Sequence, residues 1–385
     1  MNAPHDILHR AVRDGTVPGA VALVARGDDV EVVTAGSVDA EGSAPMARDS
    51  LFRIASLTKP LAAAAVMMLV EEGRLALHAP VEEWLPELAD PQVVRAPGAP
   101  VDDVVPAARP ITVEDLLSSR TGWGFPSDFS LPAVQALFPV QKDGRFLQDW
   151  PDPDTWLGRL AQVPMLYQPG EAWLYGTSSD LQGILAARAS GATLPDFLAE
   201  RIFAPLGMTD TGFAVPEAKR HRFTTLYRPT PEGGLEREDT PDGEWSRVPR
   251  FHSGGGGLVS TADDWLAFAR MLLDNGEANG RRVLTPASVG RMTENHLTAA
   301  QRDTAALFLE GQGWGYGGQV DVAPTDPWNV PGRYGWVGGT GTTAHVVPAD
   351  GTVAILLTQV SMTDPTPTPL MRDFWRSAAG SRPAG

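Results

Sequence analysis

The chain has 385 residues, enough for two or three domains or for one large domain with an insertion. Its formal net charge of −16 argues against nucleic acid as a partner, because an acidic surface repels phosphate and gains nothing from counterion release. Cysteine is absent, which excludes disulfides, thiolate nucleophiles and cysteine-ligated metal sites.

The N-terminal sequence and the apolar runs bear on the location of the protein. Asp6 and two histidines stand where a secretory leader would have a positive start and an apolar stretch. The longest apolar run, Pro60 to Val70, is followed by Glu71 and Glu72 and is shorter than the ~20 residues that span a bilayer. We therefore expect no membrane span and a cytoplasmic location.

The first quarter of the chain predicts a helix, a hairpin and a second helix. A short amphipathic helix contains Ile7, Leu8 and Val12. Two apolar, β-branched runs, 20–25 and 30–35, are joined by Gly27-Asp28-Asp29, a hairpin signal. An apolar helix is then expected over about 57–73.

The middle of the chain differs from both ends. From about 81 to 212, helical segments near 113–117, 180–189 and 194–202 are separated by proline-rich loops. Strand patterns return at 343–347 and 352–358 around a turn, and a last helix is expected near 367–379. This arrangement predicts an α/β fold whose sheet is built from both chain termini, with a mainly helical lobe inserted between them. We place the α/β lobe at 1–75 and 282–385 and the helical lobe at 76–281, with one site between them.

The strongest chemical motif is Ser56-Leu57-Thr58-Lys59, at the start of the apolar helix. A serine hydroxyl becomes a good nucleophile when a base takes its proton, and a lysine three residues later lies on the same helix face. The helix N-terminus also offers backbone N–H groups to a developing oxyanion. A bare pattern of this kind more often marks an N-cap serine. Lysine occurs here only at positions 59, 142 and 219, however, and its use where arginine is the rule favours an amine that can become neutral.

Two further segments complete a possible site. Tyr175 lies in a turn before the helix near residue 180 and is a candidate general base or proton shuttle, with Tyr167 as the next candidate. The segment from Tyr334 to Gly341 lies just before a predicted strand, and glycines on a strand edge let a substrate acyl group approach closely and leave a free N–H for the oxyanion. Taken singly, these two features are more typical of a packed aromatic residue and of an ordinary glycine-rich loop.

In this order, the three motifs resemble those of the serine β-lactamase-like superfamily of class C β-lactamases, D,D-peptidases and family VIII carboxylesterases. The segments 111–117, 205–208 and 254–261, the last containing four consecutive glycines, resemble that family as well, so the resemblance covers nearly the whole chain. It implies an antiparallel sheet flanked by helices, a covalent acyl-enzyme, and neither metal nor cofactor. Transferred residue by residue, it implies catalytic Ser56, Lys59 and Tyr175 and an oxyanion hole made by the backbone N–H groups of Ser56 and Gly339.

Departures from the family pattern indicate the branch. Trp336 stands where β-lactamases and peptidases of this family carry a cation for the substrate carboxylate, and Thr177 replaces the asparagine of Tyr-x-Asn. Family VIII esterases tolerate both changes. Arg333 is a candidate replacement cation. The expected substrate-binding residues are Trp336, Gly338, Thr177, Trp123, Phe125 and Arg333.

We therefore expect a serine carboxylesterase that hydrolyses neutral short-chain or aromatic esters, with acyl transfer to an alcohol or amine as a related outcome. A β-lactam or D-amino-acid peptide hydrolase of the same fold is the first alternative. A non-catalytic binding module is the second, and the intact Ser56, Lys59 and Tyr175 argue against it. The expected partner is a small-molecule ester. Its acyl chain, its alcohol and the oligomeric state of the protein stay open.

Overall fold

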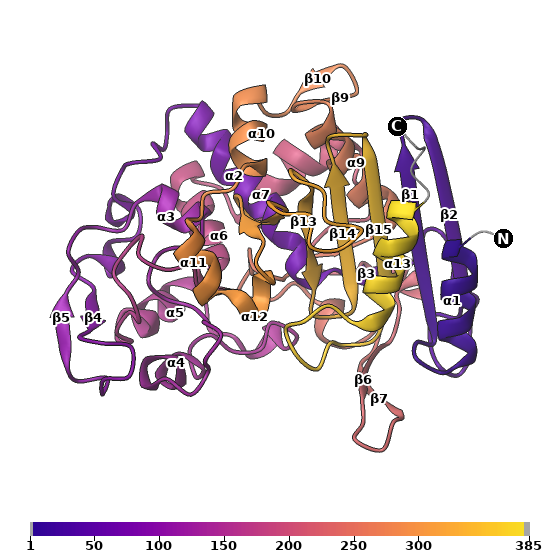
Figure 1. The fold of residues 1–385 in the computed structure, drawn as a ribbon, viewed down its shortest axis with the longest axis horizontal. Coiled ribbons are helices and arrows are strands. Elements are labelled where there is room, and N and C mark those ends of the chain that lie inside the picture. The colour runs from indigo at the N-terminus through magenta and orange to yellow at the C-terminus, as the bar shows by residue number, and fades with distance from the viewer. Residues whose placement is uncertain (1–2, 381–385) are drawn as a thin grey trace.

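A sheet built from both ends of the chain organises the protein, which a computed structural model describes over residues 3–380 (Figure 1). Seven strands pair in the order β11-β12-β13-β14-β15-β1-β2, and every neighbouring pair is antiparallel. The strands are β1 (Gly19–Arg26), β2 (Asp29–Gly36), β11 (Gly313–Trp314), β12 (Gln319–Val320), β13 (Tyr334–Gly338), β14 (Thr342–Val347) and β15 (Thr352–Thr358). The predicted fold class is thereby confirmed.

The two predicted hairpins are confirmed, and together they join the two ends of the chain. Strands β1 and β2 pair across Gly27 and Asp28, and β14 and β15 pair around the turn at 348–351. Strand β1 then pairs with β15, with Leu23 opposite Ile355. All residues of β14 and β15 are buried, as expected for strands covered on both faces.

Strand β13 bears on one expectation from the sequence. The glycine-rich segment 334–341 is expected at a strand edge just before a strand, with an ordinary glycine-rich loop as the alternative, and Tyr334–Gly338 is itself a fully buried strand that pairs with β14. Glycine weakens intrinsic strand preference, whereas the pairing partner and burial decide the outcome in the folded protein. The segment that was expected to precede the last strands therefore belongs to the sheet itself.

Helices cover the sheet on both faces and fill the inserted region. Helices α1 and α13 pack together at the end of the sheet where the two termini lie, and α9 contacts β1, β14 and β15 (Figure 1). The helices are α1 (Ala3–Arg13), α2 (Lys59–Glu71), α3 (Val113–Leu117), α4 (Pro132–Leu137), α5 (Pro153–Leu160), α6 (Thr177–Ser190), α7 (Leu194–Leu198), α8 (Ala204–Leu206), α9 (Ala262–Leu273), α10 (Pro286–Thr293), α11 (Ala299–Thr304), α12 (Ala306–Leu309) and α13 (Pro369–Gly380). Within residues 3–380, no helix is both long and apolar enough to cross a membrane.

Short strand pairs outside the main sheet are absent from the sequence-based expectation. They are β3 (Phe52–Arg53) with β8 (Val259–Ser260), β4 (Gln92–Val94) with β5 (Val104–Pro106), β6 (Leu226–Pro229) with β7 (Leu235–Asp239), and β9 (Glu277–Ala278) with β10 (Arg281–Arg282). Pairs of two to five residues carry too little periodicity to be recognised in a sequence. The division into two lobes at the predicted boundaries stays a prediction.

Helix α2 is the central helix of the molecule. Every residue from Lys59 to Leu69 is buried, which confirms that this apolar run forms a buried helix. It packs against α6 on one side and contacts α10 on another. Residues at its N-terminal end are therefore held by both the sheet and the helical region.

The pH dependence of stability is expected to depend in part on His345. This side chain is buried on β14 against the ring of Trp375, and burial, together with the charge of Arg333, lowers its pKa well below the ordinary value. It is therefore neutral in the folded protein, whereas the unfolded chain takes up a proton below about pH 6.5. The contribution of this residue to the free energy of unfolding therefore falls by about 1.4 kcal/mol for each unit that the pH drops below that value.

A comparison of wild type with His345→Gln tests this prediction, because glutamine keeps a polar side chain but takes up no proton. Urea unfolding measured from neutral to mildly acidic pH is expected to show the wild type losing stability relative to the variant as the pH falls. A difference in unfolding free energy that stays constant with pH would contradict it.

Candidate active site

Ser56 lies in a tight turn that leads directly into α2. The turn is a 3₁₀ helix, Ala55–Thr58, so Ser56 precedes the α-helix and Lys59 is its first residue, which corrects the expected helix start at residue 57. Ala55 has a φ of +43°, in the left-handed region that costs a non-glycine residue about 1–3 kcal/mol. The hydroxyl of Thr58 donates to the Ala55 carbonyl at 2.7 Å and accepts from the Leu258 N–H at 3.2 Å, which fixes the strained turn.

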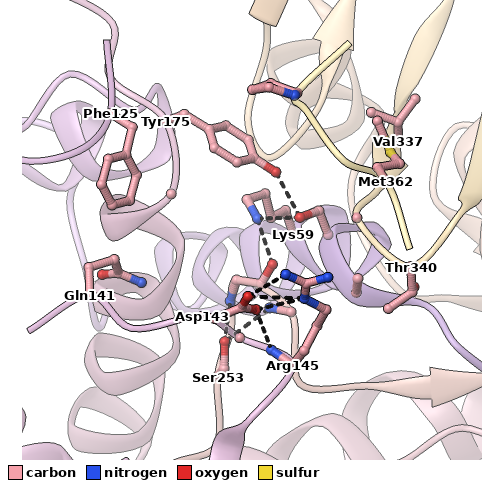
Figure 2. A pocket seen from close by; sticks show the side chains of 18 of the residues that line it. Lys59, Phe125, Gln141, Asp143, Arg145, Tyr175, Ser253, Val337, Thr340 and Met362 are labelled. Carbon is pink, nitrogen blue, oxygen red and sulfur yellow. Dashed lines mark hydrogen bonds and ion pairs between the residues drawn. The ribbon is translucent and has the colours of Figure 1, made fainter. Parts of the chain in front are cut away.

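Two side chains, those of Lys59 and Tyr175, reach the Ser56 hydroxyl. Lys59 Nζ lies 2.9 Å and Tyr175 Oη 2.7 Å from Ser56 Oγ. The Lys59 side chain is 3% exposed, and its amine also lies 4.7 Å from the centre of the Tyr175 ring. Figure 2 shows the Lys59 amine and the Tyr175 hydroxyl pointing toward the same place in the pocket. The hydroxyl thus has two groups within proton-transfer distance.

Tyr175 is fixed by a backbone pairing and by aromatic contacts. Its N–H and carbonyl exchange hydrogen bonds with those of Phe125, at 3.0 and 2.9 Å. Gly176, the next residue, has a φ of +100° and turns the chain into α6. The tyrosine ring stacks on Phe308 with centroids 4.8 Å apart. These contacts leave the ring one position, with its hydroxyl over Ser56.

Trp336 reaches the site from β13 and uses its indole N–H within the protein. Nε1 donates to the Tyr175 hydroxyl at 3.0 Å, and the ring packs edge-on against Trp314 at 4.8 Å. The side chain is 2% exposed. The hydrogen bond to Tyr175 was not foreseen from the sequence, because the pairing of a strand residue with a residue 161 positions away leaves no local signal.

A cavity of about 410 Å³ opens over these residues, within the size range of small-molecule sites. In Figure 2, Phe125 and Gln141 lie on one side of it and Val337, Met362 and Thr340 on the other. Its apolar lining includes Phe125, Trp150, Trp245, Phe308, Trp336, Val337 and Met362. Its charged lining includes Lys142, Asp143, Arg145, Asp180 and Asp364 beside Lys59.

Six of the residues expected from the sequence line this cavity: Ser56, Lys59, Phe125, Tyr175, Trp336 and Gly339. Gly338 and Thr177 do not. A Cβ on Gly338 would lie 2.5 Å from the Ile54 carbonyl, so this glycine lets β13 approach the turn that carries Ser56. Thr177 is buried as the first residue of α6. Both residues support the walls rather than face the cavity.

Two more of the expected binding residues lie outside the cavity lining. Trp123 is 2% exposed and belongs to the core, where its indole N–H donates to the Val163 carbonyl at 2.8 Å. Arg333 is 5% exposed; it lies 3.5 Å from Asp321 and over the ring of Trp375, away from the cavity. Side chains alternate along a strand, so Arg333 and Trp336, three residues apart, point to opposite faces of the sheet. Tyr167, the reserve tyrosine, is also outside the cavity lining.

Sequence reasoning missed a buried polar group below Lys59. Asp180 on α6 is 2% exposed and lines the cavity, and Gln141, Ser253 and Gly255 surround it. The four glycines at 254–257 were a visible signal, but a sequence does not show which carboxylate a glycine loop packs against. Asp180 follows Tyr175 by five residues and stands in a helix of mostly small residues, which could have drawn attention to it.

The chain is similar to known proteins over most of its length. Residues 5–372 match the family model described as Beta-lactamase. The chain is 38% identical to Protein Rv1367c of Mycobacterium tuberculosis, with 90% of this chain and 86% of the relative covered. It is 32% identical to Esterase EstB of Burkholderia gladioli, covering 92% and 89%. Among solved structures, EstCE1, described as a hydrolase with promiscuous acyltransferase activity, superposes with a TM-score of 0.79 at 24% identity, covering 98% of both chains.

The close approach at Gly338 generates a prediction with a neighbouring control. Gly338→Ala is expected to lower the unfolding free energy by about 1–3 kcal/mol, because the added methyl overlaps the Ile54 carbonyl and the Thr342 hydroxyl. Gly339→Ala, where a Cβ meets nothing within 4 Å, is expected to change it by less than about 0.5 kcal/mol. Urea unfolding of both variants measures the difference, and equal losses would show that the contact at Gly338 is not limiting.

Proposed function

Because the chain belongs to the Beta-lactamase family, whose relatives include an esterase at 32% identity, we propose that it is a serine carboxylesterase acting through a covalent acyl-enzyme on Ser56. The observation that carries the proposal is the Ser56 hydroxyl, within 3 Å of both Lys59 Nζ and Tyr175 Oη at the base of a cavity. The substrates proposed are neutral esters with short or aromatic acyl groups.

The proposed reaction has two halves. Ser56 Oγ attacks the ester carbonyl carbon while its proton passes to the Lys59–Tyr175 pair. The oxyanion that forms accepts hydrogen bonds from the backbone N–H groups of Ser56 and Gly339. The tetrahedral intermediate collapses when the leaving alkoxide takes that proton. Water then attacks the acyl-enzyme by the same route and releases the acid. An alcohol or amine in place of water gives acyl transfer.

The proposed preference for neutral esters rests on the charges around the site. Trp336 is uncharged, and its N–H already donates to Tyr175. Arg333 lies outside the cavity. A charged hydrogen bond to a substrate carboxylate contributes ~1.5–3 kcal/mol, roughly tenfold to more than a hundredfold in binding or rate. Without a cation at that position, a β-lactam carboxylate is not expected to gain this stabilisation.

One observation keeps hydrolysis of a β-lactam or a D-amino-acid peptide as the second candidate. Lys142 and Arg145 line the cavity, so a carboxylate could meet a cation at a different place. Arg145 is already engaged by Asp143 and Glu238, which neutralises much of its charge. Lys142 is the remaining cation of the pair, and a Lys142→Ala variant would lose activity on such substrates selectively.

Modification of Ser56 tests the proposed nucleophile. A fluorophosphonate is expected to add one mass increment to the peptide that contains Ser56, because Lys59 and Tyr175 activate its hydroxyl. Ser56→Ala should not be labelled. The variants Ser56→Ala, Lys59→Ala and Tyr175→Phe are each expected to lower kcat by several orders of magnitude, with losses far from additive because the residues act as a unit.

A label on another residue of active enzyme would contradict the assignment. Absence of label together with absence of turnover for every ester tested would favour a binding module. Full activity of Tyr175→Phe would show that another group relays the proton.

The substrate preference is tested by direct competition. Wild-type protein is expected to hydrolyse p-nitrophenyl acetate or butyrate with a higher kcat/KM than nitrocefin, since the apolar cavity wall accepts a neutral acyl group and Trp336 supplies no cation. The net charge of −16 also slows the approach of anions at low ionic strength. Ser56→Ala is the control for non-enzymatic hydrolysis. A higher kcat/KM for nitrocefin would overturn the ester preference and promote the second candidate.

A further inference from the structure

We propose that Asp180 is a positioning residue that holds Lys59, through the backbone of Gly255, beside Ser56 and stabilises the proton that the Lys59–Tyr175 pair receives from it. This inference rests on the proposed function, because it assigns a role in the activation of the same serine. It also gives a purpose to the glycine run 254–257, which the proposed reaction does not otherwise use.

The carboxylate of Asp180 is surrounded by hydrogen-bond donors. Oδ1 accepts from the Ser253 hydroxyl at 2.5 Å and from the Gly255 N–H at 3.0 Å, and Oδ2 accepts from Gln141 Nε2 at 2.7 Å. The Ser253 oxygen itself accepts the N–H groups of Gly255 and Gly256, so its own proton points to the carboxylate. Three donors around a buried carboxyl group satisfy its ionised form.

Burial disfavours the ionised form of Asp180, whereas its hydrogen-bond partners favour it. Burial raises the pKa of Asp180, and the hydrogen bonds from Ser253 and Gln141 and the charge of Lys59 act in the opposite direction. The attraction between an ionised Asp180 and positive charge at Lys59 is mutual. The Asp180 carboxylate therefore stabilises the positive charge that forms when a proton leaves Ser56 for the Lys59–Tyr175 pair.

The backbone of Gly255 links Asp180 to Lys59 through two hydrogen bonds. Its N–H donates to Asp180, and its carbonyl accepts from Lys59 Nζ at 2.5 Å. A Cβ on Gly255 would lie 3.1 Å from both carboxylate oxygens, and one on Gly254 would overlap the Ser179 carbonyl on α6. Only a loop without side chains at these two positions can lie this close to α6. The glycine run thus places one carbonyl directly under the lysine amine.

The other charged groups of the cavity are the same in wild type and in the variants below. They are Lys142, Asp143, Arg145 and Asp364 on the lining, with Tyr175 beside the amine. Asp143 and Glu238 both pair with Arg145. A change in the pH profile on altering Asp180 is therefore assigned to the loss of its own charge.

Asp180→Asn removes the charge while the hydrogen bonds can be kept. Among the described residues, Gln141 Oε1 has no hydrogen-bond partner, so rotation of that amide lets it accept from the amide of the introduced asparagine. Asp264→Asn is the matched control: this carboxyl group is also buried, accepts from the Thr211 hydroxyl and the Asp210 N–H, and lies outside the cavity. Circular dichroism and thermal unfolding establish that both variants fold.

The measurement is the rate of fluorophosphonate labelling of Ser56 as a function of pH, followed by mass spectrometry. Removing a negative charge makes the Lys59–Tyr175 pair lose its proton more easily, whichever member carries it. The acid limb of the rate profile is therefore expected to move to lower pH by roughly half a unit or more in Asp180→Asn. Asp264→Asn should superimpose on wild type.

Gly255→Ala provides the second variant, should Asp180→Asn fail to fold. Its methyl group displaces the carbonyl that holds Lys59, and a shift of this kind is expected to slow labelling about tenfold to a hundredfold. Labelling of Asp180→Asn at the wild-type rate with the wild-type pH profile would overturn the role of Asp180 alone. Labelling of Gly255→Ala at the wild-type rate would do the same. A wild type that is never labelled at Ser56 would overturn the proposed function and this inference together.

Discussion

The burial of one amine governs the construction of this site. Lys59 is the first residue of a helix that is buried over eleven consecutive residues, so its side chain has no route to bulk water except through the cavity. A buried amine needs hydrogen-bond acceptors, and here they are the Ser56 hydroxyl and the Gly255 carbonyl. The position of Ser56, the glycine run and the aromatic ring of Tyr175 are all arranged around this single group.

The sheet contributes the wall on the other side of the serine. Because Gly338 has no side chain, β13 can lie against Ile54 and Ala55, and this brings Trp336 within hydrogen-bonding distance of Tyr175. The tyrosine is thereby held from three directions, by Phe125 through the backbone, by Phe308 through stacking and by Trp336 through its N–H. Such fixation reduces the reorganisation needed when a proton moves through the hydroxyl.

Much of this arrangement could be predicted from the sequence, for reasons that are local. The hairpins at Gly27 and Gly351 have turn residues between β-branched runs, and the spacing of Ser56 and Lys59 places them on one helical turn. Contacts across the fold were not predictable in the same way. The burial of Trp123, the position of Arg333 away from the cavity and the pairing of Asp180 with Gly255 depend on which segments the fold brings together, and no local pattern encodes that.

The central claim is that acyl transfer passes through Ser56, and trapping the intermediate during turnover tests it most directly. Acid quenching of the protein while it hydrolyses p-nitrophenyl butyrate, followed by peptide mass spectrometry, is expected to find one butyryl group on the peptide that contains Ser56 and none in Ser56→Ala. A butyryl group on another residue, or continued turnover by Ser56→Ala, would contradict the account.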